Sequence, residues 1–365
     1  MRLGASPSRV GDQQSADSRL HCSTALRDVG IDSRRAPRNL RPLRMSSLAI
    51  SISGVSKRYA HHVAVRSLSL QVPRGTVYGL LGPNGAGKTT SIRMILNIIA
   101  PDTGSISVLG VPGDDRSIVD RIGYLPEERG LYRKMQVRRV LRFLGELKGL
   151  GGRDLDRRID AWLERLGLMG GGADWGDSKV DELSRGMQQK VQFIGALLHD
   201  PELVILDEPF SGLDPINAQA LKDTVVDLRR QGRTVIFSTH LMDNAERLCD
   251  AVCIIAGGEK VLDGPVNEVR DSHAGRFVAL AFEEAPSPAV EAILSDPAWV
   301  IRRDDSHRLL ELELPEQVQP AALLTALVQA GAAIERFERI RPSLHRIFLE
   351  KVGATHVEPG MSGHG

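Results

Sequence analysis

Residues 77–89 read VYGLLGPNGAGKT, and this stretch decides the fold. Its first five residues are almost entirely apolar, which is typical of a strand that is covered on both faces of a parallel sheet. The next eight residues fit the pattern GxxxxGK[ST], in which backbone N–H groups of a glycine-rich loop surround a phosphate at the start of a helix. In this pattern Lys88 reaches the β- and γ-phosphates and the Thr89 hydroxyl ligates Mg²⁺. The nucleotide-binding residues predicted here are Gly82, Pro83, Asn84, Gly85, Ala86, Gly87, Lys88, Thr89 and Thr90.

A second motif lies at residues 203–208, which read LVILDE. Four apolar residues predict a central strand, and two carboxylates follow at its C-terminal end, where open α/β sheets bind ligands. We expect Asp207 to hold Mg²⁺ and Glu208 to polarise the water that attacks the γ-phosphorus. Acidic pairs after strands are common on protein surfaces, so the prediction depends on the pairing with the phosphate loop. Together the two motifs predict ATP hydrolysis with ATP and Mg²⁺ as the bound species.

Strands and helices alternate along residues 47–272, which predicts an α/β domain built on a P-loop NTPase sheet. Half-buried strands with alternating polar residues at its start predict an antiparallel β subdomain. Helical spacing over 136–150 and 153–168 predicts a helical insert at about 130–185. The predicted strands are 49–55, 67–72, 77–81, 203–206, 234–237 and 251–256, and the predicted helices begin near residues 88, 186, 216 and 241.

A second, smaller domain is predicted over residues 275–352. Its pattern reads as strand 277–282, helix 288–294, strand 299–303, strand 308–314, helix 318–330 and strand 333–340. The order β-α-β-β-α-β is the split βαβ arrangement of ferredoxin-like α+β domains. A short amphipathic helix with Leu344, Ile347 and Phe348 closes it.

Composition limits the remaining possibilities. The net charge is +1, so no overall field indicates nucleic acid as a partner. Three cysteines in 365 residues do not make a disulfide framework, and no apolar run approaches the length of a membrane span. Residues 1–46 and 353–365 are predicted to be disordered. The first 44 residues hold nine Arg and no Lys or Glu, so an organellar transit peptide or an upstream start codon before Met45 are alternatives.

Further motifs lie between and after the two chemical ones. Residues 183–186 read LSRG, residues 206–209 read LDEP, residues 211–214 read SGLD, and His240 ends a predicted strand. In this order, over residues 48–270, the chain resembles the ATPase subunit of ABC transporters.

The resemblance implies roles that spacing alone does not give. It implies that adenine stacks on Tyr59 and that His240 contacts the γ-phosphate. It also implies that Ser184 and Gly186 contact the nucleotide held by a second ATP-binding subunit, most simply a second copy of this chain. Asp214 then communicates across the dimer.

Two positions depart from the family pattern. Glu127 stands where a glutamine commonly touches Mg²⁺ and the attacking water, so Glu127 is a predicted nucleotide and metal contact. Arg185 and Met187 replace Gly and Gln in the usual LSGGQ. These changes and the added C-terminal domain are similar to the ATPases of ABC-2-type and sodium-extruding exporters.

The favoured hypothesis is therefore an ATPase that drives export through a separate transmembrane permease, at the cytoplasmic face of the cell membrane. The alternative is an ABC ATPase that acts on a ribosome or nucleic acid without transport. A single phosphate loop and the absence of heptads argue against this alternative. The insert near 130–150 is the predicted permease contact, through Leu131, Tyr132 and Met135 beside Arg138 and Arg139.

Overall fold

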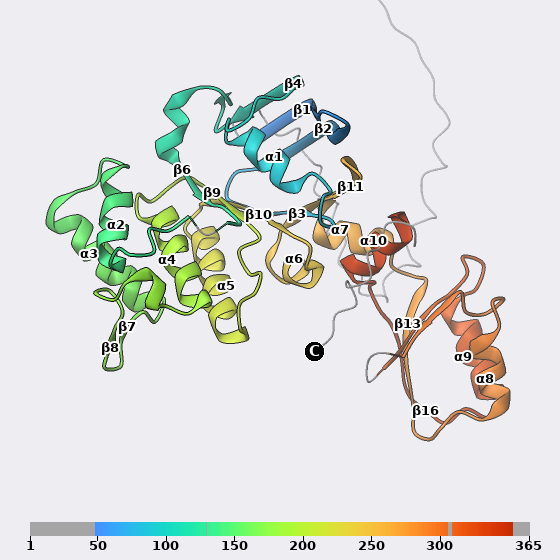
Figure 1. Cartoon of the computed structure of the whole chain (residues 1–365). Coiled ribbons are helices and arrows are strands. Elements are labelled where there is room, and N and C mark those ends of the chain that lie inside the picture. The colour runs from blue at the N-terminus through green and yellow to red at the C-terminus, as the bar shows by residue number, and fades with distance from the viewer. Residues whose placement is uncertain (1–47, 129, 306–308, 353–365) are drawn as a thin grey trace, which may run out of the picture. The chain divides into compact units, whose positions relative to one another are not determined.

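The computed structural model describes residues 48–128, 130–305 and 309–352 (Figure 1). Residues 1–46 and 353–365, for which the sequence predicts disorder, lie outside the described residues. Within the described part, no helix has both the length and the apolar character needed to cross a bilayer.

A six-stranded sheet carries the phosphate loop, in the order β12-β11-β3-β10-β9-β6. All neighbours are parallel except β12, which pairs antiparallel with β11. Along β3, Val77 and Leu81 join one buried cluster while Tyr78 and Leu80 join the other. Burial on both faces explains the apolar runs in the sequence. The strands are β3 (Val77–Leu81), β6 (Ile122–Leu125), β9 (Leu203–Asp207), β10 (Thr234–Thr239), β11 (Ala251–Ala256) and β12 (Glu259–Pro265).

The predicted antiparallel β subdomain is confirmed as a second sheet, in the order β2-β1-β4-β5. It packs with α1 (Lys88–Ile95) in the cluster on one side of the central sheet. The sequence predicted only parts of its first two strands, and it did not predict the last two. The four strands are β1 (Leu48–Tyr59), β2 (His62–Pro73), β4 (Thr103–Val108) and β5 (Val111–Pro112), and the 3₁₀ helix η2 (Arg116–Arg121) follows.

Helices pack on the other side of the central sheet, and the predicted helical insert is among them. The insert contains α2 (Val137–Glu146), α3 (Gly152–Arg165), the hairpin β7 (Met169–Gly170) and β8 (Ala173–Asp174), and the 3₁₀ helix η3 (Val180–Glu182). The same cluster includes α4 (Arg185–Leu197), α5 (Pro215–Arg230), α6 (Met242–Leu248) and α7 (Val266–Ser272).

One arginine organises the insert. Arg138, on α2, forms ion pairs with Asp160 of α3 at 3.0 Å, with Asp174 at 2.9 Å and with Asp177 at 3.2 Å. Because three carboxylates hold it, Arg138 is a structural residue of the insert and not the free surface charge that the sequence predicted. Leu131 and Met135 are likewise partly buried against the core, so of the predicted apolar contacts only Tyr132 is exposed.

The C-terminal domain has the predicted ferredoxin-like topology. Its antiparallel sheet has the order β14-β15-β13-β16, which places the first strand between the third and the fourth. Two helices, α8 and α9, and strands β13 and β15 together supply most of the buried apolar cluster of this domain. The elements are β13 (Phe277–Phe282), α8 (Pro288–Ser295), β14 (Arg302–Asp304), β15 (Leu310–Glu313), α9 (Pro320–Gln329), β16 (Ile334–Arg339) and α10 (Leu344–Val352).

One boundary in this domain was predicted wrongly. Residues 299–301 were assigned to a strand, but β14 begins at Arg302. The backbone N–H groups of Trp299 and Val300 both donate to Asp296 O at 2.9 Å, which closes a turn after α8. Val300 is apolar because it enters the domain core and not because it lies in a strand.

Candidate nucleotide site

The phosphate loop connects β3 to α1, and two of its glycines have no room for a side chain. An added Cβ at Gly82 would lie 2.1 Å from Ile255 O, and one at Gly87 would lie 2.4 Å from Ala64 O. Both residues also have positive φ angles, 150° and 104°, which non-glycine residues rarely adopt. The loop is therefore held tightly between β2 and β11, with its backbone curled over the start of α1.

Lys88 is 6% exposed and lies back over this loop. Its Nζ donates to Gly82 O at 2.9 Å and to Pro83 O at 3.1 Å, and it lies 3.6 Å from Glu208 Oε1. A buried ammonium needs such partners because an unpaired charge is costly to bury. Phosphate oxygens are better partners than carbonyls for a cation, so these contacts can be exchanged for a nucleotide.

The two predicted acids lie at the end of β9. Asp207 is fully buried, and its Oδ1 accepts hydrogen bonds from Ser238 Oγ and, at 3.3 Å, from Thr89 Oγ1. Glu208 N donates to the same Ser238 Oγ at 3.0 Å. Ser238 therefore links both acids to β10, a role that the sequence did not predict.

Glu208 is held in an unusual backbone conformation. Its φ is 46°, and such strain in a residue other than glycine is often found at functional sites. The predicted switch residue His240 is adjacent, with Nδ1 3.0 Å from Glu208 Oε1. Lys88 Nζ and His240 Nδ1 therefore lie close to the same oxygen, Glu208 Oε1.

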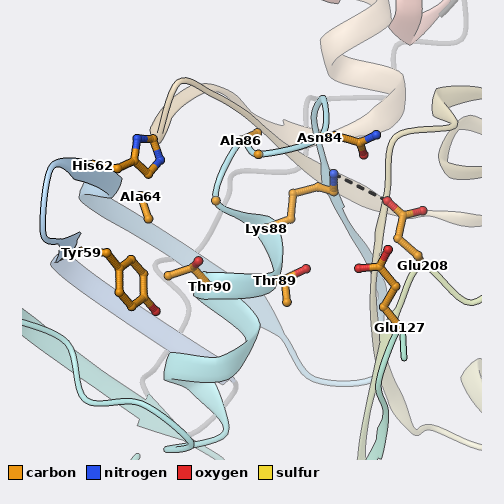
Figure 2. Close-up of a pocket in the computed structure, with 12 residues that line it drawn as sticks. Tyr59, His62, Ala64, Asn84, Ala86, Lys88, Thr89, Thr90, Glu127 and Glu208 are labelled. Atoms are coloured by element: carbon orange, nitrogen blue, oxygen red, sulfur yellow. Dashed lines mark ion pairs between the residues drawn. The ribbon is translucent and has the colours of Figure 1, made fainter. Parts of the chain in front are cut away.

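A cavity of about 390 Å³ lies over the phosphate loop, within the usual range for small-ligand sites. Figure 2 shows Tyr59, His62 and Ala64 on one side of the loop, and Glu127 and Glu208 on the other. The predicted residues that line the cavity are Tyr59, Asn84, Gly85, Ala86, Gly87, Lys88, Thr89, Thr90, Glu127 and Glu208.

His62 and Ala64 also line the cavity and were missed. The sequence feature that could have predicted His62 is the two-residue turn at Ala60 and His61. This turn makes Tyr59 and His62 direct partners across the β1–β2 hairpin. In Figure 2 the Tyr59, His62 and Ala64 side chains all lie on the hairpin side of the cavity.

The residues predicted to hold Mg²⁺ fit that ion. Asp207 Oδ2 is a buried oxygen that has no hydrogen-bond partner among the described residues, so it can accept a cation. In the same part of the chain no three acidic, histidine or cysteine side chains form a metal cage. Mg²⁺ that binds with nucleotide phosphates usually takes only one or two carboxylates and keeps its other ligands as water or phosphate. Burial and the nearby Asp207 raise the pKa of Tyr124 to about 12, which keeps this neighbouring phenol neutral.

Ser184, Gly186 and Asp214 do not line the cavity. Ser184 caps α4, with Oγ accepting from Met187 N at 3.3 Å, and Asp214 caps α5, accepting from Asn217 N at 3.0 Å. That hydrogen bond holds the pKa of Asp214 below its usual value. An added Cβ at Gly186 would lie 2.8 Å from Asn217 Nδ2, so this amide joins the LSRG and SGLD segments.

A buried parallel sheet, a tight phosphate loop after β3 and paired acids at the end of β9 define a P-loop ATPase. Comparison with known proteins then gives the family. The family model for the ABC transporter matches residues 65–211, and the model for the C-terminal domain of DrrA1-3-like ATP-binding proteins matches residues 264–352.

Curated relatives match nearly their whole length. An uncharacterised ABC transporter ATP-binding protein, YhaQ of Bacillus subtilis, is 40% identical over 84% of this chain and 99% of its own. The Nod factor export ATP-binding protein I of Rhizobium sp. is 36% identical over 85% and 98%. The daunorubicin resistance ATP-binding protein DrrA3 of Streptomyces coeruleorubidus is 33% identical over 85% and 97%.

Solved structures agree on the fold. The ATP-binding subunit of an ABC transporter, 30% identical, covers 62% of this chain with a TM-score of 0.56, and the match spans 93% of that subunit. The chain belongs to the ATP-binding proteins of ABC transporters and is an ATPase with a DrrA-like C-terminal domain. The predicted resemblance to exporter ATPases is confirmed.

Proposed function

We propose that this chain is the ATP-hydrolysing subunit of an ABC exporter that dimerises around two Mg-ATP molecules and drives a separate membrane permease. The carrying observation is that Ser184 and Gly186 lie outside the cavity that holds Lys88 and Glu208. A site that needs both sets of residues is incomplete in one chain and is completed head to tail by a second. Relatives with export names favour transport over action on a ribosome or nucleic acid.

The chemistry follows from the residues around the cavity. Lys88 would exchange the carbonyls of Gly82 and Pro83 for phosphate oxygens, and Thr89, Asp207 and Glu127 are the residues that would hold Mg²⁺. The ion supplies charge neutralisation at the phosphates. Glu208 accepts a proton from the attacking water, and His240 fixes its carboxylate and reaches the γ-phosphate. Phosphoryl transfer requires mainly such positioning and charge stabilisation.

This proposal is tested by trapping the dimer. Glu208→Gln keeps the size of the side chain but cannot accept the proton, so ATP should stay bound and unhydrolysed. Size-exclusion chromatography with light scattering should show a dimer with Mg-ATP and a monomer with ADP. Full turnover in Glu208→Gln, or the absence of a nucleotide-dependent dimer even with the permease present, would contradict the proposal.

We propose that the permease contacts the insert, at the cytoplasmic face of the membrane. The Tyr132 side chain is 53% exposed and meets Phe143 edge to face, with ring centroids 5.6 Å apart. Leu147, 65% exposed, lies at the C-cap of α2, four residues after Phe143. Exposed aromatic and aliphatic side chains of this kind are common at the centre of protein interfaces.

A pair of neighbouring arginines tests this contact. Arg139 is exposed and has no ion pair among the described residues, whereas Arg138 is held by three carboxylates. Tyr132→Ala with Arg139→Glu should weaken recruitment to membranes that contain the permease while leaving ATP binding intact. Arg138→Glu serves as the contrast, because it should lower the melting temperature instead. Unchanged recruitment of the Tyr132→Ala, Arg139→Glu protein would place the contact elsewhere.

A further inference from the structure

Helix α4 connects two parts of the ATPase that the proposed function treats separately. Its N-terminus begins at Ser184, and its C-terminal half packs on β6. The approach is close, because an added Cβ at Gly123 of β6 would lie 2.2 Å from Ala196 O of α4. This contact brings the loop that follows β6, with Glu127 and Glu128, alongside the middle of α4.

Gln192 makes the connection in that region. Its side chain is 7% exposed, and Nε2 donates to Glu128 O at 3.0 Å. Its Oε1 is buried and has no hydrogen-bond partner among the described residues. The flanking residues of α4, such as Val191 and Phe193, are fully buried and apolar.

A glutamine at this position is not explained by stability. An unsatisfied buried acceptor destabilises the fold, whereas an apolar side chain of similar shape has no such penalty. The net stabilisation from the single hydrogen bond to Glu128 O is smaller than the penalty for the unsatisfied acceptor. What the amide does provide is a fixed distance between α4 and the loop that carries Glu127.

A second glutamine, one turn earlier on α4, lies close to the residue that follows the other acid, Glu208. Gln189 is 4% exposed, and its Nε2 lies 3.5 Å from Pro209 O, at the limit of a hydrogen bond. Glu128 follows Glu127 in the chain, and Pro209 follows Glu208. Both amides therefore approach the carbonyl of the residue directly after an acid that lines the cavity.

We propose that Gln192 is a positioning residue that ties the Glu127–Glu128 loop to α4. The placement of Glu127 at its own nucleotide then depends on the placement of α4, whose first turn faces the nucleotide of the second subunit. This step rests on the proposed two-chain function. It gives each site a direct mechanical connection to the other that does not pass through the phosphate loop.

The test uses the full chain and the substitution Gln192→Met, which keeps the length and volume of the side chain and removes the donor. Gln219→Met on α5 is the matched control, because exposed Gln219 also loses one side-chain hydrogen bond, to Asp223 at 2.7 Å. Three properties are measured: the melting temperature, hydrogen exchange of residues 125–131 without nucleotide, and binding of a fluorescent ATP analogue during titration with MgCl₂.

We expect Gln192→Met to melt at the wild-type temperature or above it, to exchange faster in residues 125–131, and to bind the analogue normally without Mg²⁺. The Mg²⁺ concentration that gives the half-maximal change in analogue binding should rise about threefold to tenfold. This rise does not exceed the smallest loss of metal affinity, about tenfold, that is typical when hydrogen-bond partners of direct metal ligands are removed. Gln219→Met should match the wild type. Wild-type exchange and Mg²⁺ dependence in Gln192→Met, or equal changes in Gln219→Met, would overturn the proposal. Failure of the wild type itself to bind the analogue would refute the proposed function instead.

A double-mutant cycle with Glu127 tests the positioning role of Gln192 even if Gln192→Met is less stable than expected. If Gln192 acts through Glu127, Gln192→Met should not raise the Mg²⁺ requirement further in a Glu127→Ala chain, because residues that act together are not additive. Additive shifts in the Mg²⁺ concentration would show that Gln192 acts independently of Glu127, and the positioning role would be wrong.

Discussion

The two halves of the proposed ATP site are built in different ways. On the phosphate side, Lys88 and Glu208 are at least 93% buried and are held by several contacts within the chain. On the other side, Ser184 and Asp214 cap the exposed starts of two helices. The first half is preorganised by the fold, whereas the residues of the second half lie outside the cavity. The difference supports the proposal that each chain holds a nucleotide on its phosphate side and takes the remaining groups from a second subunit.

The largest effect is expected on the phosphate side. Lys88→Ala should weaken ATP binding about tenfold to a hundredfold, because hydrogen bonds between charged groups contribute about 1.5–3 kcal/mol. Turnover should fall further, since Lys88 also stabilises charge that develops during transfer. Binding is measured with a fluorescent ATP analogue and compared with Lys260→Ala, which alters the Lys260–Asp263 ion pair of β12 outside the cavity lining. If Lys88→Ala bound the analogue as tightly as the wild type, Lys88 of the phosphate loop would not contribute to ATP binding, contrary to the proposed function.

A smaller effect is expected at Glu127, which lines the cavity over the phosphate loop. Glu127→Gln keeps an oxygen near Mg²⁺ and removes a negative charge next to the γ-phosphate, so activity should need less Mg²⁺. Glu127→Ala removes the oxygen and should need more. Titration of ATPase activity with MgCl₂ should therefore move in opposite directions in the two variants, by severalfold, as expected for one ligand of a site with few protein ligands. No change in either variant would show that Glu127 lies outside the ion's coordination.

The smallest effect is expected from the N-terminal segment. Deletion of residues 1–44 should leave the melting temperature and ATPase activity unchanged, because an arginine-rich segment with few apolar residues cannot bury enough surface to offset ordering. Calorimetry and an ATPase assay on the shortened chain are sufficient. A clear loss in either measurement would mean that this segment contributes to the fold or the site.

Local sequence predicted the phosphate side well because its parts are contiguous. The strand, loop and first helix lie within residues 77–95. The glycines of the pattern stand where the loop backbone has positive φ angles and leaves no room for a side chain. Strands β4 and β12 were missed since they are only partly buried and are polar for much of their length.

Contacts between distant residues could not be read in the same way. Gln192 and Glu128 are 64 positions apart, and Gln192 alone resembles any polar residue of a helix. Ser238 has the same difficulty, because its contact with Asp207 spans 31 positions. Arg138 was interpreted as a surface charge because its three partners lie 22 to 39 positions further along the chain, on α3, on the unpredicted strand β8 and in the segment that follows β8.

The central claim is that Ser184 completes the site of a second chain. The most direct measurement is the mass of the Mg-ATP complex of Glu208→Gln, with and without Ser184→Arg. The account predicts a dimer for Glu208→Gln and a monomer for the double variant, because the arginine obstructs the shared site, while both bind ATP equally. A dimer of undiminished stability in the double variant would contradict the account, since Ser184 would then lie outside the interface.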